Sequence, residues 1–150
     1  MEKCVKQLRA LDENPFVEVM SAHRNPERVR TFAGGAEEDG IEVIIAAAGM
    51  SNALAGAIAA QTCLPVIGVP LVSGSLGGLD ALLSTVQMPP GIPVATVSVG
   101  DAGAKNAALF AIQIIARHDD KLAALYRTFK ANQADAVEAK NKSLQKKLSS

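Results

Sequence analysis

The chain contains few aromatic residues and no excess charge of either sign. With no Trp, one Tyr and four Phe among 150 residues, it offers little surface on which nucleic-acid bases stack. Its 15 basic and 15 acidic residues balance, so the net charge does not indicate a nucleic acid or an anionic membrane as a partner. We therefore expect neither kind of partner.

Long hydrophobic runs and paired cysteines are also absent. Gly, Pro or Asn interrupts every apolar run before the roughly 18 to 20 residues that a membrane helix needs, and no basic-then-apolar leader opens the chain. Cys4 and Cys63 are far apart and match no metal-ligand spacing, which favours reduced thiols. The sequence thus predicts a soluble, cytoplasmic protein without a metal site.

Short apolar runs alternate with segments of helical character. Strands are expected at 16–20, 41–48, 64–69 and 92–99, where Val and Ile dominate. Helices are expected within 25–39, 51–62, 77–88 and 103–116. Near-continuous apolarity in the strands is typical of a parallel sheet covered on both faces. We expect a single α/β domain over residues 1–150, with helices on both faces of a parallel sheet.

Both ends of the chain have helical patterns. One helical face at the start gathers Cys4, Val5, Leu8 and Leu11. Because a strand normally precedes the first helix of a parallel α/β sheet, we expect an N-terminal strand to be missing. From 119 to 148 the composition turns polar, yet Leu122, Leu125 and Phe129 form a narrow apolar stripe. This predicts a long C-terminal helical tail, which docks either on its own chain or on a neighbouring subunit.

The stretch "SAHR" follows the first expected strand and has side chains suited to catalysis. In open α/β sheets, ligands bind beyond the carboxyl ends of the strands. His23 can transfer a proton near neutral pH, and the guanidinium of Arg24 suits a phosphate or a carboxylate. Asn25 and Pro26 are typical of a helix start, whose positive dipole end would lie nearby. A solvated or structural histidine is the alternative for His23.

Two further loops follow expected strand ends. In "AAAGMSNALAG", Gly49 permits a tight turn, and Ser51 and Asn52 can cap the next helix or help to hold an anion. The glycine-rich segment 71–80 either closes over a substrate or crosses the surface. Neither segment matches a P-loop or a dinucleotide fingerprint.

Other polar residues are weaker candidates. Asp101, Lys105 and Asn106 follow the fourth expected strand and either reach the site or stay solvated. His118 lies beside Asp119 and Asp120 at an expected helix start, which favours capping or an interface.

Several long motifs occur together, in order. "SAHRNPERV", "VIIAAAGMSNALAG", "LPVIGVP" and "GLDALLSTVQMPPGIPVATVSVG" resemble the family of N5-carboxyaminoimidazole ribonucleotide mutases and aminoimidazole ribonucleotide carboxylases of purine biosynthesis. The resemblance implies a flavodoxin-like, three-layer subunit that assembles into a homo-octamer. It implies carboxyl transfer to C4 of the imidazole through carbon dioxide, on a small-molecule ribonucleotide, with neither metal nor organic cofactor.

The resemblance also implies roles for particular residues. His23 would be catalytic and shuttle the C4 proton, while Ser21 and Arg24 would hold the ribose phosphate. The loop 73–78 would close the pocket against water. The implied substrate-binding residues are Ser21, Ala22, Arg24, Ala48, Gly49, Ser51, Asn52, Leu54 and Ser73.

The sequence departs from the family pattern at three places. The Gly-Ser-x-Ser-Asp loop after the family's first strand is absent. The segment 53–56 reads Ala-Leu-Ala-Gly where many mutases have His-Leu-Pro-Gly, and Met50 stands where the carboxylase form has Arg. Because the long stretch 68–100 resembles the mutase form more, we favour a mutase of IMP biosynthesis. The alternatives are a carboxylase that uses carbon dioxide directly and a truncated, non-catalytic nucleotide-binding subunit.

Overall fold

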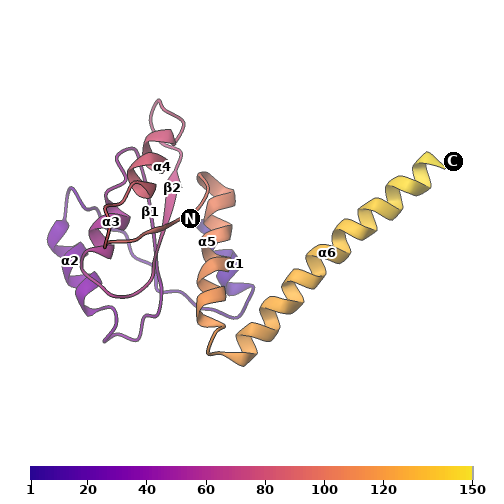
Figure 1. Cartoon of the computed structure of the whole chain (residues 1–150), viewed down its shortest axis with the longest axis horizontal. Helices are drawn as coiled ribbons and strands as arrows, with labels where there is room; N and C mark the ends of the chain where they lie inside the picture. Colours follow the sequence, from indigo (N-terminus) through magenta and orange to yellow (C-terminus); the bar gives the residue numbers. More distant parts are fainter. Residues whose placement is uncertain (150) are drawn as a thin grey trace.

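The computed structural model describes residues 1–149 and contains a parallel sheet of three strands (Figure 1). The strands are β1 (Ile44–Gly49), β2 (Val66–Leu71) and β3 (Ala95–Thr96), in the order β1-β2-β3. The register places Ile44 opposite Val66 and Gly49 opposite Leu71. The expected α/β fold with a parallel sheet is confirmed.

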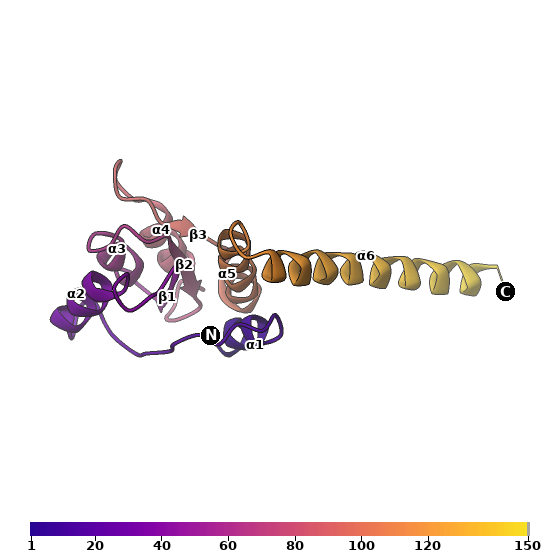
Figure 2. The same cartoon turned by 90° about the horizontal axis from the view of Figure 1, so that it is seen from below.

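Helices cover both faces of the sheet, as the nearly continuous apolarity of its strands requires. On one side lie α2 (Pro26–Gly35), α3 (Leu54–Ala59) and α4 (Leu79–Val86), and on the other lie α1 (Glu2–Arg9) and α5 (Gly100–Ile115) (Figures 1 and 2). The central strand β2 is the most deeply buried, since Ile67 and Val69 pack toward α5 while Val66 packs toward α3. Two separate apolar clusters, one on each face, therefore sandwich the sheet.

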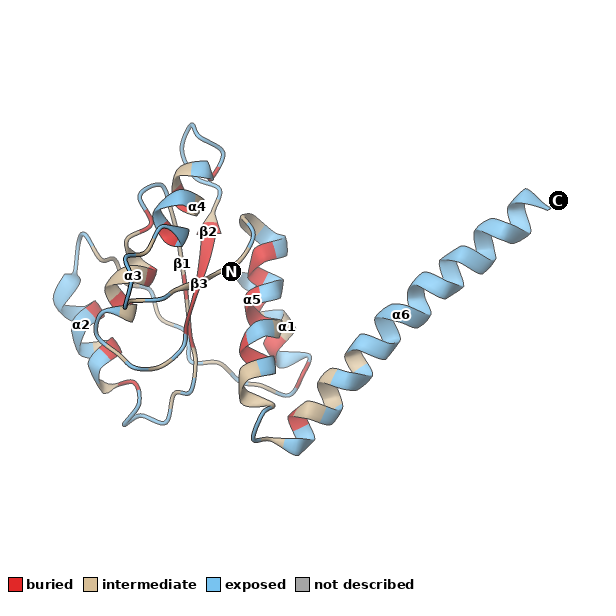
Figure 3. Cartoon of the chain, in the orientation of Figure 1, coloured by how far each residue is buried: buried red, intermediate tan, exposed pale blue. Residues whose placement is uncertain are grey.

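The long C-terminal helix expected from the sequence is confirmed as α6 (Asp120–Leu148). The Asp119 side chain caps it by accepting a hydrogen bond from the Leu122 N–H at 2.8 Å. Leu122 is buried, and Leu125 and Phe129 are half-buried against the cluster around α5. Beyond these turns the described part of the helix is exposed and projects from the body (Figure 3). The apolar stripe therefore docks on its own chain.

Polar contacts join the start of α6 to the rest of the fold. Lys121 Nζ donates to Asp12 Oδ2 at 3.0 Å, and this hydrogen bond raises the pKa of Lys121. His118 Nε2 lies 2.5 Å from Glu42 Oε2. His118 therefore does not cap α6, since Asp119 is the N-cap residue of that helix. Among residues 1–149, no helix is both long and apolar enough to cross a membrane.

Two strand predictions from the sequence are wrong. Residues 16–20 form no strand, because β1 is the edge of the sheet and no other strand lies beside this segment to bond its backbone. Residues 92–99 contribute only β3, where Ala95 and Thr96 pair with β2. That pairing stops early because Pro70, two residues after Gly68 on the same edge of β2, has no N–H to donate.

Candidate functional site

A cavity of about 630 Å³ lies at the carboxyl end of β1. Its lining comes from three places in the chain: the turn after 16–20, the end of β1 with its following loop, and the loop after β2. The lining residues are Met20, Ser21, Ala22, His23, Arg24, Ala48, Gly49, Met50, Ser51, Ala53, Leu54 and Ser73. The cavity thus occupies the edge of the sheet at which the sequence predicts a ligand site.

A closed turn presents His23 and Arg24 to the cavity. Asn25 N–H donates to the Ser21 carbonyl at 3.0 Å, and Ser21 N–H donates to Asn25 Oδ1 at 2.6 Å. Ser21 Oγ also lies 3.3 Å from the Arg24 N–H. Asn25 is the N-cap of α2 as expected, but its side chain serves the turn and not the helix. Because Ser21 and Asn25 fix both ends, the two exposed side chains between them are held at the tip of the turn.

The second wall is the loop from Met50 to Ala53, which hydrogen bonds from α4 hold in place. Met50 has a positive φ of 54°, and Ala53 N–H donates to the Ser51 carbonyl at 2.8 Å. Ser84 Oγ accepts the Asn52 N–H at 2.8 Å, and Thr85 Oγ1 accepts Asn52 Nδ2 at 2.9 Å. The predicted capping of α3 by Ser51 or Asn52 is wrong, because Ala53 occupies the N-cap position. The amide of Asn52 instead anchors the loop to α4.

The third wall of the cavity is the loop that follows β2, and it approaches the end of β1 so closely that position 49 requires glycine. A Cβ on Gly49 would lie 2.4 Å from Ser73 Cβ and 3.3 Å from the Leu71 carbonyl oxygen. The loop then turns through Gly74 and Gly78, whose φ angles of 70° and 88° favour glycine. Gly49 therefore allows the ends of β1 and β2 to form one side of the cavity.

Arg24 and His23 dominate the electrostatics of the cavity. The lining holds no Asp or Glu, so within the described residues its only full charge is that of the Arg24 guanidinium, with His23 as its titratable neighbour. Between Met1 and Ser149, no group of three or more His, Cys, Asp and Glu side chains is placed to hold a metal ion. The cavity suits an anionic, polar ligand.

The structure brings nearly all of the predicted site residues together. Ser21, Ala22, His23, Arg24, Ala48, Gly49, Ser51, Leu54 and Ser73 all line the cavity. Asn52 does not, since its side chain is only 1% exposed and lies behind the loop, where its Oδ1 has no hydrogen-bond partner within residues 1–149. Asp101, Lys105 and Asn106 are exposed on α5 and do not line the cavity.

Sequence reasoning missed three lining residues, Met20, Met50 and Ala53. Each of the three is a neighbour in sequence of a residue that was predicted to line the site, and this position could have identified them. A residue next to the end of a strand lies at the same edge of the sheet as that end. Ser84 and Thr85, which accept hydrogen bonds from Asn52, gave no such signal. They follow Asn52 in the chain by 32 and 33 residues, so no local sequence pattern connects them to it.

Replacing Ser84 with alanine is expected to lower the free energy of unfolding by about 1 to 3 kcal/mol, because the Asn52 N–H loses its acceptor. Urea unfolding measures this change. Ser143→Ala is the matched control, since this serine lies in α6, is exposed and makes no side-chain hydrogen bond among the described residues. We expect the control to be neutral or slightly stabilising. Equal stabilities for the two variants would show that Ser84 does not hold the loop.

Comparison with known proteins places this geometry in context. A chain described as the crystal structure of Treponema denticola PurE superposes with a TM-score of 0.84 and 28% sequence identity, covering 95% of this chain and 88% of that chain. Together with the parallel three-layer arrangement, this likeness confirms the flavodoxin-like fold expected from the sequence.

Sequence comparisons agree with the structural one. The N5-carboxyaminoimidazole ribonucleotide mutase of Escherichia coli (strain K12) is 53% identical over 121 residues, which are 81% of this chain and 72% of that protein. The protein of that name from Mycobacterium tuberculosis (strain ATCC 25618 / H37Rv) is 52% identical over 146 residues, which are 97% of this chain and 83% of the relative. The family model described as AIR carboxylase matches residues 1–136. The chain belongs to the AIR carboxylase family.

Proposed function

We propose that this chain is an N5-carboxyaminoimidazole ribonucleotide mutase of purine biosynthesis, and that it forms 4-carboxy-5-aminoimidazole ribonucleotide. The observation that carries the proposal is the cavity itself, in which one turn presents a histidine and an arginine opposite the glycine-containing end of β1. The two relatives described above, each about half identical to this chain, carry the mutase name.

The proposed reaction moves a carboxyl group without any outside oxidant or reductant. The bond from the exocyclic nitrogen to the carboxyl carbon breaks, which releases carbon dioxide, and that nitrogen takes up a proton. Carbon dioxide then forms a bond to C4 of the imidazole, and C4 loses its proton. His23 is our candidate for this proton transfer, because an imidazole can both donate and accept near neutral pH.

Carbon dioxide must stay in the cavity between the two bond changes. The loop 73–78 begins at Ser73 in the cavity lining and is exposed until it reaches Gly78. Gly74 and Gly77 in this loop have positive φ angles of 70° and 60°. We propose that the loop folds over the bound ribonucleotide and keeps water out.

Arg24 is our candidate for binding the ribose phosphate. Losing one charged hydrogen-bonding partner commonly costs about 1.5 to 3 kcal/mol, so we expect Arg24→Ala to raise KM by about 10- to 150-fold with a smaller change in kcat. Arg30→Ala is the control, since Arg30 pairs with Glu27 on the exposed side of α2 and does not line the cavity. An unchanged KM for Arg24→Ala would remove Arg24 from the phosphate site.

The direct test follows imidazole absorbance with two substrate mixtures. A mutase converts N5-carboxyaminoimidazole ribonucleotide at low bicarbonate, whereas a carboxylase converts aminoimidazole ribonucleotide only when carbon dioxide is supplied. We expect turnover of the first substrate. Turnover of the second alone would favour the carboxylase alternative, and turnover of neither would favour a non-catalytic nucleotide-binding subunit.

We also predict a homo-octamer and a cytoplasmic location. Supporting the oligomer, α6 has exposed Val137, Leu144 and Leu148 at spacings of seven and four residues, which place them near one helical face. Light scattering should give eight times the 15.6 kDa mass of the chain. A monomer mass would contradict the assembly without bearing on the chemistry of His23.

A further inference from the structure

Met50, which lines the cavity at the carboxyl end of β1, holds a backbone conformation that methionine rarely adopts. Its φ of 54° lies in the left-handed region, where among the described residues only Asp12, at 70°, is another non-glycine residue. Contacts on both sides fix this conformation, since Gly49 pairs with Leu71 in the sheet and Asn52 is tied to α4. A strained residue that its surroundings hold in place is typical of a functional site.

The side chain of Met50 lies between the cavity and the loop 73–78. Met50 lines the cavity and is nevertheless 58% exposed. A Cβ built on Gly74 would lie 3.7 Å from Met50 Cγ, which is an ordinary van der Waals distance. Met50 therefore already rests against the loop for which we propose closure.

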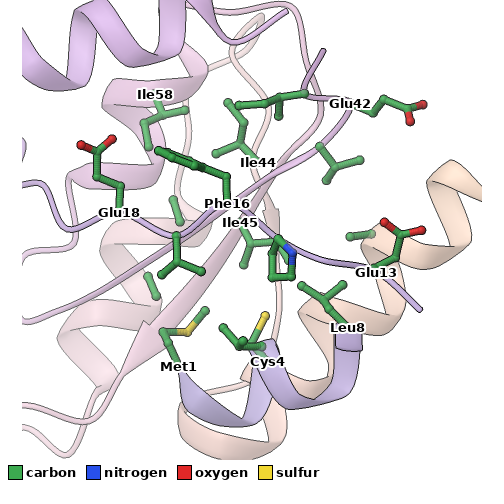
Figure 4. Close-up of a pocket in the computed structure, with 18 of the residues that line it drawn as sticks. Met1, Cys4, Leu8, Glu13, Phe16, Glu18, Glu42, Ile44, Ile45 and Ile58 are labelled. Atoms are coloured by element: carbon green, nitrogen blue, oxygen red, sulfur yellow. The ribbon is translucent and has the colours of Figure 1, made fainter. Parts of the chain in front are cut away.

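Met50 differs from the other large apolar side chains of the cavity in what it faces. Those side chains are Met20 and Leu54, and both also line a second cavity, of about 570 Å³. That second cavity lies between α1 and β1, among Ile44, Ile45 and other apolar side chains (Figure 4). Met50 lines only the first cavity and contacts the loop, so it is the large apolar side chain on the solvent side of the site.

The loop carries a matching apolar side chain. Leu76 lies two residues after Gly74 and is 62% exposed, while the rest of 73–78 is serine and glycine. Gly74 and Gly77, on either side of Leu76, have positive φ angles, and glycine moves between backbone conformations at little steric cost. Closure of the loop would bury Leu76 against Met50, and this burial of apolar surface would favour the closed state.

Resting on the mutase function proposed above, we propose that Met50 is a positioning residue that seats the closed loop 73–78 through Leu76 and so retains carbon dioxide. The interval concerned begins when the bond from the exocyclic nitrogen to the carboxyl carbon breaks, and it ends when the bond to C4 forms. An unbranched thioether adapts to the apolar surface that it covers and offers water only a weak acceptor. The contact between Met50 and Leu76 thus keeps carbon dioxide inside the cavity and water outside it.

The test follows the fate of the carboxyl group. Substrate with an isotopically labelled carboxyl carbon is converted in unlabelled bicarbonate, and mass spectrometry measures the fraction of product without the label, corrected for a blank without protein. We expect Met50→Gly to raise this loss of label by about fivefold, because removing part of an apolar contact shifts the closed-to-open ratio by that order. Met50→Leu, which keeps an apolar side chain, should restore the parent's value. An unchanged loss of label in Met50→Gly would overturn the proposal.

Asp12→Gly is the matched control, since it relieves the other positive φ and Asp12 does not line the cavity. The exposed contact of Asp12 with Lys121 contributes little to stability. Both glycine variants should keep or raise the urea midpoint of unfolding, because glycine adopts a positive φ without strain. A loss of label in Met50→Gly would then not reflect a loss of folding. An equal loss in both variants would assign the effect to the backbone and overturn the role of the Met50 side chain.

Hydrogen exchange of the Leu76 amide separates this proposal from the mutase function, because it requires no turnover. Saturating aminoimidazole ribonucleotide should slow this exchange by about fivefold in the parent and in Met50→Leu, but not in Met50→Gly. Slowing that depends on Met50 in a chain without turnover would support the role of Met50 and contradict the mutase function alone. Equal slowing in Met50→Gly and the parent, or no slowing in any version, would overturn the role of Met50.

Discussion

Replacing His23 with asparagine is expected to lower turnover of N5-carboxyaminoimidazole ribonucleotide by about 10²- to 10⁴-fold, because the cavity loses its group for proton transfer. The exposed imidazole makes no hydrogen bond within the described residues, and the turn that presents it is closed by Ser21 and Asn25. The variant should therefore fold and assemble normally. Initial rates at saturating substrate, together with a circular dichroism melt, measure both expectations.

The chain supplies its own matched control for this experiment. His118 is the second of its two histidines, is exposed, contacts Glu42, and does not line the cavity. His118→Asn should keep turnover within about twofold of the parent, since surface substitutions away from a site cost little. Near-normal turnover of His23→Asn would remove His23 from the chemistry. Equal losses in both variants would point to a general effect on folding.

The sequence predicts this site well because topology alone brings its parts together. Gly49 ends β1 and Ser73 follows β2, and the carboxyl ends of parallel strands meet at one edge of a sheet; His23 follows an apolar run that forms no strand but leads to the same cavity. No knowledge of side-chain packing was needed for that inference. The same logic does not reach Ser84 or Thr85, which hold Asn52 from the middle of α4. Their role depends on which helix packs behind the loop, and a local pattern does not contain that information.

The two wrong strand predictions have the same physical origin. Residues 16–20 have the apolarity of a strand, but a strand exists only where a neighbour bonds its backbone, and none of the described residues does so. Residues 92–99 lose most of their pairing because of Pro70, which lies on a different strand. Apolar patterning indicates which segments can be buried as strands. The partner's backbone then decides how much of each becomes a strand.

Replacing Gly49 with alanine is expected to lower the free energy of unfolding by about 1 to 3 kcal/mol, as overpacking of a tight contact does. The new Cβ would lie 2.4 Å from Ser73 Cβ, so the end of β1 and the loop after β2 must separate. Turnover should fall as well, because both segments line the cavity. Urea unfolding and steady-state kinetics measure the two effects.

Gly34→Ala is the matched control and should change stability in the opposite direction. Gly34 lies in α2, its φ is not in the left-handed region, and a Cβ there would meet nothing within 4 Å. Alanine should therefore stabilise the helix by up to about 1 kcal/mol. The same substitution, glycine to alanine, thus distinguishes Gly49, which a close approach of two segments requires, from Gly34, which only adds conformational entropy to the unfolded chain.

A double variant shows whether the contact with Ser73 is the cause. Ser73→Gly removes the Cβ that the new methyl group would meet, so Gly49→Ala should cost less in the Ser73→Gly background than in the parent. The 3.3 Å approach to the Leu71 carbonyl oxygen would remain and leave a smaller residual cost. Additive effects of the two substitutions would contradict the close approach. If Gly49→Ala cost nothing in the Ser73→Gly background, the contact with Ser73 alone would account for the requirement for glycine at the end of β1.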